Sequence, residues 1–165
     1  KKDQTHNVTL DVIGSKPNQV RMEVSATLGV SLASLVIDED QIAYAIHPQK
    51  KYFSGLVSDL ALKPLFQIEL NPKYLMNVFF DRAIPEKNWS CTMGVDQLVE
   101  KCERLSDGLS IDWRERKGEQ KRVVIKSSDF EVQVLVKDFT TKVELNSKTF
   151  SLDIPQGYKA YKFRQ

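Results

Sequence analysis

Apolar and polar residues alternate along most of the first third of the chain. Val20, Met22 and Val24 are separated by Arg21 and Glu23, which is the period of a β-strand with one buried and one solvated face. The same period recurs in the neighbouring segments, with turn residues between them. We therefore expect an antiparallel meander with strands over residues 8–13, 20–26, 31–37, 42–46 and 51–54.

The spacing of apolar residues becomes helical in the middle of the chain. The apolar residues within 75–80 fall on one face of a helix. Asn71 is a good N-cap for it, and Pro72 suits the first helical position, where a missing N–H costs nothing. A short helix over residues 58–62 is also expected, and Pro64 limits how far it extends.

From Trp89 onward the two-residue period returns. Alternation is clearest over residues 130–136, which predicts a half-buried strand. A hairpin is expected around the turn Lys117-Gly118-Glu119. The remaining strands of this meander are expected at residues 109–114, 121–126, 143–145 and 150–154.

Strands, a helical insert and more strands together predict an α+β fold. We expect one large antiparallel β-sheet with the short helical insert packed against one face. A long twisted sheet tends to curl, so the expected geometry is an incomplete or half β-barrel whose concave side is lidded by the helices. No linker, repeat or low-complexity segment divides the chain, so residues 1–165 are expected to form a single domain.

Charge and hydropathy narrow the classes of function. The 24 basic and 22 acidic side chains leave a net charge of +2, which gives no electrostatic footprint for nucleic acid. No apolar run approaches the roughly 18 residues that span a bilayer. Local basic clusters occur at Lys50-Lys51 and at Lys159, Lys162 and Arg164. They are either solvated chain ends or contacts for phosphate or anionic lipid.

The two cysteines, Cys91 and Cys102, allow two interpretations. They form a local disulfide in an oxidising compartment, or two buried thiols in a reducing one. The even count on neighbouring segments favours the disulfide. With only two histidines and no Cys-x-x-Cys, a metal site is not expected.

Known catalytic motifs are absent from the sequence. It has no glycine-rich phosphate loop, no Gly-x-Ser-x-Gly and no His-Glu-x-x-His. His47 lies beside Pro48 without a neighbouring nucleophile, which favours a solvated loop histidine over a catalytic base. Trp89 and Trp113 are expected in the core or at its rim. We therefore expect a non-enzymatic protein without a cofactor.

Several segments, in their order and spacing, resemble the LolB-like outer-membrane lipoprotein receptors of the LolA/LolB fold group. They are the strand Arg21–Gly29 that ends in a Leu-Gly step, Ser31–Ile37, Lys51–Gly55, the stretch Pro64–Pro72 with Leu75, Phe79 and Ala83-Ile84-Pro85, and the closing segment Phe150–Tyr158. The resemblance covers most of the chain. It is a pattern of order and spacing and includes no catalytic signature.

The resemblance implies a half-barrel whose apolar interior takes the acyl chains of lipoproteins or lipids. It implies a location in the bacterial periplasm, with the protein anchored to the outer membrane by a lipidated N-terminal cysteine. That cysteine is absent here, and we expect the first strand to be missing with it, because Lys1–Gln4 is typical of the trimmed end of a longer chain. A periplasmic lipoprotein carrier is the implied partner, and a periplasmic location favours the disulfide further.

In these receptors, a protruding leucine in the loop before the second of these strands helps to place lipoproteins in the membrane. Leu28 is the matching position, although Ala26-Thr27 replaces the usual polar and proline residues before it. The alternative is that Leu28 packs at a strand end. Apolar candidates for the cavity wall, each of which could equally be plain core, are Val20, Met22, Val24, Leu35, Ile37, Tyr44, Ile46, Leu65, Leu75, Phe79, Val132 and Val134.

Two functions remain open from the sequence. The first is a lipoprotein of the cell envelope that binds acyl chains in an apolar cavity. Such binding depends on buried area, so it needs few polar residues at fixed positions. The second is an envelope protein-interaction module that shares the fold but has a filled cavity.

Overall fold

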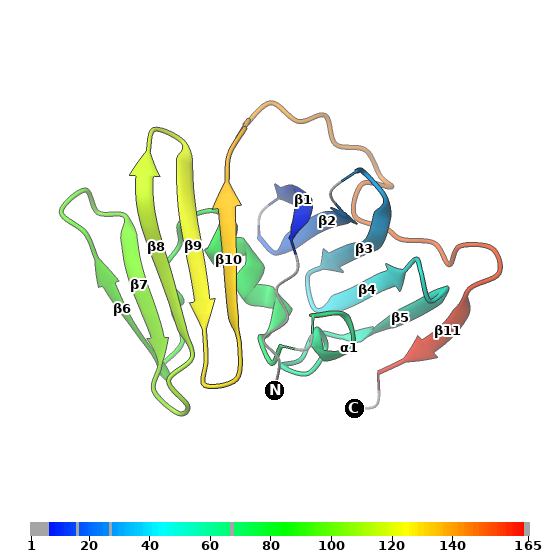
Figure 1. Cartoon of the computed structure of the whole chain (residues 1–165), viewed down its shortest axis with the longest axis horizontal. Coiled ribbons are helices and arrows are strands. Elements are labelled where there is room, and N and C mark those ends of the chain that lie inside the picture. Colours follow the sequence, from blue (N-terminus) through cyan, green and yellow to red (C-terminus); the bar gives the residue numbers. More distant parts are fainter. Residues whose placement is uncertain (1–6, 16, 27, 67, 164–165) are drawn as a thin grey trace. The chain divides into compact units, whose positions relative to one another are not determined.

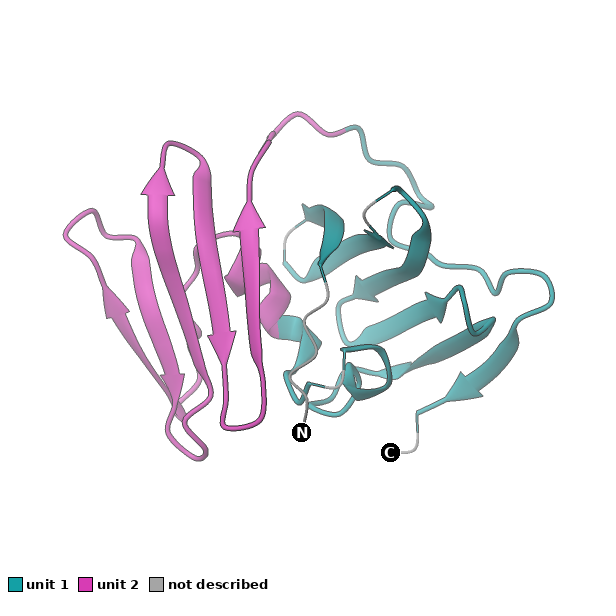
Figure 2. Cartoon of the chain, viewed as in Figure 1, with its two compact units in different colours: residues 1–73, 144–165 teal, residues 74–143 magenta. Residues whose placement is uncertain are grey.

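The computed structural model describes residues 7–15, 17–26, 28–66 and 68–163. The chain forms two compact units, residues 1–73 with 144–165 and residues 74–143 (Figure 2). Each unit contains its own sheet. That residues 1–165 form a single domain stays a prediction. The expected trimmed end at Lys1–Gln4 lies outside the described residues.

The first unit contains a six-stranded sheet in the order β1-β2-β3-β4-β5-β11 (Figure 1). Its strands are β1 (Val8–Ser15), β2 (Gln19–Ala26), β3 (Ser31–Asp38), β4 (Gln41–Ile46), β5 (Lys51–Leu56) and β11 (Lys159–Lys162). The first five are joined as the antiparallel meander predicted from the alternation. β11 runs parallel to β5, which the sequence pattern did not indicate.

The second unit contains a five-stranded antiparallel sheet in the order β10-β9-β8-β7-β6. Its strands are β6 (Trp89–Met93), β7 (Val99–Arg104), β8 (Ser110–Lys117), β9 (Gln120–Lys126) and β10 (Glu131–Val136). The predicted hairpin turn lies between β8 and β9, where Gly118 has a φ of 61°. Exposed and half-buried residues alternate along β10, as predicted for this segment.

The prediction of one large sheet was wrong, because the strands form two sheets, one in each unit. β5 ends before the helical insert and β6 begins after it, so this insert separates the two meanders. The described part of the chain is mostly β with few helices, in rough agreement with an α+β fold. Neither sheet closes on itself: β1 and β11 are the edges of one, and β10 and β6 of the other.

The helical elements are short: α1 (Lys63–Phe66), a 3-10 turn (Pro72–Tyr74) and α2 (Leu75–Phe79). Asn71 caps the 3-10 turn rather than α2: its Oδ1 accepts from the Lys73 N–H at 3.2 Å, whereas the N-cap of α2 is Tyr74. The helix expected over residues 58–62 is not formed. Instead Pro64 lies in the first turn of α1, where proline is tolerated. No helix within the described ranges is long and apolar enough to cross a membrane.

The strands expected at residues 143–145 and 150–154 are absent from the structure. Side chains of the first sheet bind the backbone carbonyls of this segment instead. The Arg21 guanidinium donates to the carbonyls of Thr149 and Ser151, both at 3.3 Å, and the Tyr52 hydroxyl donates to the Leu152 carbonyl at 3.0 Å. These bonds hold the backbone in an irregular path beside the sheet, so Arg21 is only half-buried rather than fully solvated.

The larger apolar core of the first unit lies on one face of its sheet, while Val36, Ala45 and Tyr52 are buried on the other face. Directly paired residues share a face of a sheet, and pairing across β2, β3 and β4 produces three apolar rows. The rows are Val24–Ala33–Ile46, Met22–Leu35–Tyr44 and Val20–Ile37 with Ile42. Every residue of these rows is buried. The Tyr44 hydroxyl donates to the Ala61 carbonyl at 3.0 Å, so the one polar group of the middle row has a partner.

Both tryptophans are buried in the second unit, as predicted. Trp113 on β8 donates from Nε1 to the Val78 carbonyl of α2 at 3.0 Å. Trp89 on β6 donates to the Tyr74 hydroxyl at 3.2 Å, and the two rings are in edge contact. These bonds attach the helical segment to the sheet through indole N–H groups that would otherwise be buried without a partner.

Candidate functional site

The turn between β2 and β3 presents an aliphatic side chain to solvent. The Ala26 N–H donates to the Val30 carbonyl at 2.9 Å, and the N–H groups of Leu28 and Gly29 both donate to the Ala26 carbonyl. Gly29 has a φ of 73°, which a residue with a side chain rarely adopts. Leu28 is 98% exposed and Val30 60% exposed. We call Ala26, Leu28, Gly29 and Val30 the Leu28 turn.

Of the two interpretations of Leu28, packing at a strand end does not describe this structure. An almost fully exposed leucine makes no core contact that would explain its place in the turn. The neighbouring sequence is uncharged, because no Asp, Glu, Lys or Arg occurs from Val24 to Ile37. The Leu28 turn is therefore an apolar tip with no charged residue in its neighbouring sequence.

A chain of polar side chains lies on the opposite face of the same sheet from the apolar rows. His47 contacts Ser34 Oγ through Nε2 at 3.0 Å and the Tyr158 hydroxyl through Nδ1 at 2.9 Å. Ser34 also donates to the Glu23 carboxylate, and Glu23 forms an ion pair with Arg21 at 2.7 Å. The expectation of a solvated loop histidine was wrong: His47 is half-buried and has two side-chain partners.

The direction of these hydrogen bonds shows whether His47 could activate Ser34 as a nucleophile. Ser34 has one hydroxyl proton, which it donates to Glu23, so His47 Nε2–H donates to Ser34. In a serine nucleophile the imidazole instead accepts the serine proton. As arranged here, the bonds join the sheet to the segment that contains Tyr158. The sequence reasoning missed this cluster because its members come from four separate segments and no local spacing connects them.

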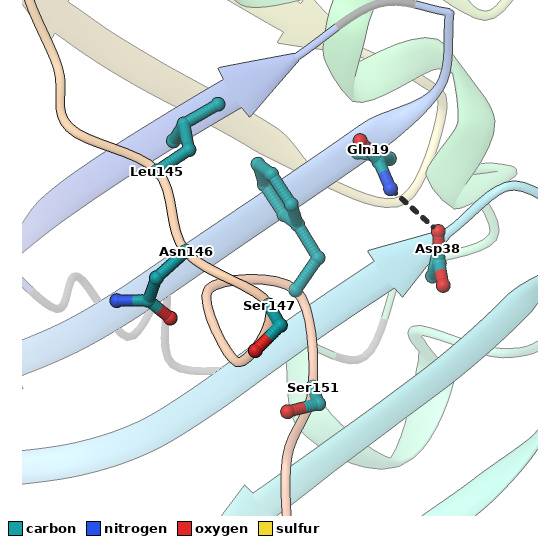
Figure 3. Close-up of a pocket in the computed structure, with 7 residues that line it drawn as sticks. Gln19, Asp38, Leu145, Asn146, Ser147 and Ser151 are labelled. Carbon is teal, nitrogen blue, oxygen red and sulfur yellow. Dashed lines mark hydrogen bonds between the residues drawn. The ribbon is translucent and has the colours of Figure 1, made fainter.

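A pocket of about 420 Å³ lies in the first unit at the end of the sheet opposite the Leu28 turn (Figure 3). Gln19 and Asp38 form one side, where Gln19 Nε2 donates to Asp38 Oδ1 at 2.8 Å. The other side comes from the irregular segment near the C-terminus. The lining consists of Gln19, Asp38, Leu145, Asn146, Ser147, Phe150 and Ser151. None of the predicted cavity-wall residues lines it.

The predicted cavity-wall residues are divided between the two units. Those in the first sheet form the apolar rows described above: Val20, Met22, Val24, Leu35, Ile37, Tyr44 and Ile46. Leu65 in α1 is half-buried in the same unit. In the second unit, Leu75 and Phe79 of α2 are buried, and Val132 and Val134 of β10 are half-buried. The structure thus brings together only the members that lie in the first sheet.

Cys91 and Cys102 form a disulfide with an S–S distance of 2.01 Å. They are direct register partners on β6 and β7, and their Cα atoms are 4.1 Å apart. This is the first of the two interpretations that the sequence allowed. Because the closed loop is short, the chain-entropy model gives a stabilisation on the order of 2–3 kcal/mol at most.

Replacing Tyr44 with phenylalanine should make stability less sensitive to alkaline pH. Burial raises the pKa of the Tyr44 hydroxyl above its ordinary value, so the folded protein retains a proton that the unfolded chain loses above about pH 10. Wild-type stability therefore falls as the pH rises beyond 10. At pH 8 the variant should be about 1 kcal/mol less stable, because the bond to Ala61 is lost. Urea unfolding at pH 8 and pH 11 should show this difference shrinking; an equal difference at both pH values would contradict it.

Within the described residues, no group of three or more His, Cys, Asp and Glu side chains is arranged to hold a metal ion. The first unit presents an apolar tip, a polar hydrogen-bond chain and a small pocket lined by both polar and apolar residues, and the second unit contains a disulfide. Neither a scan of the sequence against protein-family models nor a search among curated proteins finds a match. The resemblance to LolB-like receptors therefore stays a prediction.

Proposed function

We propose that this chain is a periplasmic lipoprotein associated with the bacterial outer membrane, and that it binds acyl chains of lipoproteins or lipids in the apolar interior of a half-barrel. Its role would be lipoprotein localisation. The observation that supports this best is the Leu28 turn, because an aliphatic side chain that is 98% exposed on a glycine turn makes no core contact that would serve a structural purpose within the first unit.

Contact with a membrane supplies such a purpose. Transfer of one leucine side chain from water to hydrocarbon contributes about 2 kcal/mol, and Val30 on the same turn adds to it. The uncharged stretch from Val24 to Ile37 means that no charge has to be desolvated when the tip enters the bilayer. In this proposal the Leu28 turn is where bound cargo passes to the outer membrane.

The apolar rows of the first sheet are the proposed source of acyl-chain binding. Each buried CH₂ of a chain contributes about 0.8 kcal/mol, without a requirement for polar groups at fixed positions. The proposed partners are the acyl chains of lipoproteins or lipids and a periplasmic lipoprotein carrier. The proposed anchor is a lipidated N-terminal cysteine.

Binding of a fluorescent fatty-acid probe tests the proposal directly. The purified chain should increase the fluorescence of the probe, and a lipidated lipoprotein should displace it, whereas the same lipoprotein without its acyl chains should not. An absence of probe binding by a folded chain would contradict the acyl-chain proposal.

Leu28→Glu should reduce lipoprotein transfer to vesicles on the order of tenfold, because the variant loses the burial of the leucine and places a charge at the bilayer. Its stability should be unchanged, since Leu28 makes no core contact. Transfer of a fluorescent lipoprotein and the urea midpoint measure the two effects. Leu60→Glu is the matched control, because Leu60 is a 58% exposed leucine in the same unit but outside the turn. Equal losses in both variants would rule out a special role for Leu28.

The alternative function, an envelope interaction module with a filled cavity, has one observation in its favour. The candidate wall residues of the first sheet are no more than 8% exposed, as in an ordinary core. This alternative predicts that the probe does not bind and that a lipoprotein binds equally well with and without its acyl chains. The probe experiment and its competition arm therefore separate the two functions.

A further inference from the structure

Lysines from the two basic clusters of the sequence lie on neighbouring strands in the structure. Lys51, the first residue of β5, is the register partner of Lys159, the first residue of β11. The Lys159 N–H also donates to the Lys50 carbonyl at 2.9 Å. Neighbouring strands are about 4.8 Å apart, and β11 lies beside β5 (Figure 1). Lys159 therefore lies close to Lys50 and Lys51, which come more than 100 positions earlier in the sequence. Arg164, at the chain end, lies outside the described residues.

These lysines lie at the same end of the sheet as the Leu28 turn. β3 starts directly after that turn, and the His47 N–H at the end of β4 donates to the Leu32 carbonyl at 2.9 Å. The β4–β5 turn that contains Lys50 is therefore beside the beginning of β3. Antiparallel pairing thus brings an apolar tip and a basic group to one end of the sheet. We call Leu28, Val30, Lys50, Lys51 and Lys159 the lysine–leucine end.

The positive charges of this end are not neutralised within the described part of the chain. No ion pair there involves Lys50, Lys51 or Lys159; the one recorded side-chain contact is Lys159 Nζ over the Tyr161 ring at 5.4 Å. Like charges directly opposite each other on adjacent strands are destabilising. An external anion would remove this repulsion.

The β3–β4 turn at the opposite end of the same sheet is acidic. It contains Asp38, Glu39 and Asp40, all of them exposed, whereas Lys162, the last residue of β11, is an exposed cation toward that end. The first sheet therefore has a basic, apolar end and an acidic turn at the other end. Near an anionic surface, this asymmetry turns the lysine–leucine end toward the surface and the acidic turn away from it.

We propose that the lysine–leucine end docks on a bilayer that contains anionic phospholipid. The lysines lie among the headgroups, and Leu28 and Val30 enter the acyl region below them. Long lysine side chains suit this position because their stems reach across the interface while the ammonium groups remain in the polar layer. The proposal deepens the role given above to the Leu28 turn and rests on it, but it does not require an acyl chain to be bound.

Vesicle cosedimentation tests this docking with the full chain. The wild type should bind vesicles of phosphatidylcholine mixed with phosphatidylglycerol and should bind pure phosphatidylcholine far more weakly. The triple variant Lys50→Gln, Lys51→Gln, Lys159→Gln should lose about fivefold in affinity per lysine, on the order of 100-fold in total. Raising the salt concentration should weaken the wild type and affect the variant much less.

A second triple variant, Lys87→Gln, Lys117→Gln, Lys142→Gln, is the matched control, because these exposed lysines of the second unit change the net charge equally. It should bind anionic vesicles like the wild type, and Lys→Arg at positions 50, 51 and 159 should restore binding. Equal losses of affinity in both Gln triple variants, or wild-type binding that does not depend on phosphatidylglycerol, would overturn the proposal.

Fatty-acid probe binding should be the same in all variants, so a failed docking proposal is distinguishable from a failed acyl-chain proposal. Should the Gln triple not fold, the dependence of wild-type binding on salt and phosphatidylglycerol decides the question.

Discussion

Asp81→Asn should lower the free energy of unfolding by about 3 kcal/mol, a large effect for one polar substitution. Asp81 binds two cations of the second sheet: Oδ2 lies 2.7 Å from Lys121 Nζ and Oδ1 lies 2.8 Å from Arg116 Nη1. The Lys121 side chain is only 7% exposed, and its ammonium also donates to the Phe79 carbonyl at 2.7 Å. With asparagine in its place, one neutral amide oxygen replaces two carboxylate oxygens, and the buried Lys121 ammonium loses its opposite charge.

Asparagine is the appropriate replacement because it tolerates the φ of 54° that Asp81 adopts. The measured loss then reflects charge rather than backbone strain. Asp112→Asn is the control: its partner Arg114 is 59% exposed, and the N–O distance is 3.3 Å, so the cost should stay below about 1 kcal/mol. Adding Lys121→Met to Asp81→Asn should recover part of the stability, since the uncompensated buried charge is removed. Urea unfolding measures all four proteins; equal losses for Asp81→Asn and Asp112→Asn would contradict this account.

Leu35→Ala should lower the free energy of unfolding by about 3 kcal/mol, within the usual range for a fully buried leucine. Leu35 is 0% exposed and lies in the middle row of the first sheet, between Met22 and Tyr44. Truncation to alanine removes Cγ and both Cδ atoms together with their contacts. It leaves a cavity that the strands on either side cannot easily close.

The same substitution bears on the proposed acyl-chain site. If the apolar rows face a filled core in solution, the full loss is expected; a loss below about 1 kcal/mol would mean that Leu35 faces open space. Leu60→Ala, at a 58% exposed leucine, controls for the chemistry of the substitution. A bound fatty acid should raise the unfolding midpoint of the wild type, because a ligand that binds only the folded state stabilises it.

Sequence pattern predicted the meander of β1 to β5 and the half-buried character of β10. In these strands the information is local: a period of two, β-branched and aromatic residues, and turn residues between them. The capped turn at Asn71 and Pro72 was predictable for the same reason, because a cap depends on residues only a few positions apart.

Prediction failed where a distant side chain controls the backbone. Apolar and polar residues alternate over residues 150–154 as clearly as in many β-strands. The carbonyls of Ser151 and Leu152 nevertheless accept from Arg21 and Tyr52 rather than from a neighbouring strand. No local pattern contains that information. For Pro64 the ambiguity was different: proline is compatible with the start of a helix and with its end, and only the surrounding packing selected the start.

The sequence by itself determined the β-rich character of the chain, the buried faces of β2 and β4 and the uncharged stretch around Leu28. The tertiary structure decided that the strands form two sheets, that Leu28 is exposed, and that Lys51 pairs with Lys159. The physical reason is that alternation reports which face of a strand is buried but not which strand lies beside it. Pairing between segments far apart in sequence therefore placed the lysines beside the Leu28 turn, and the lysine–leucine end exists only in the folded chain.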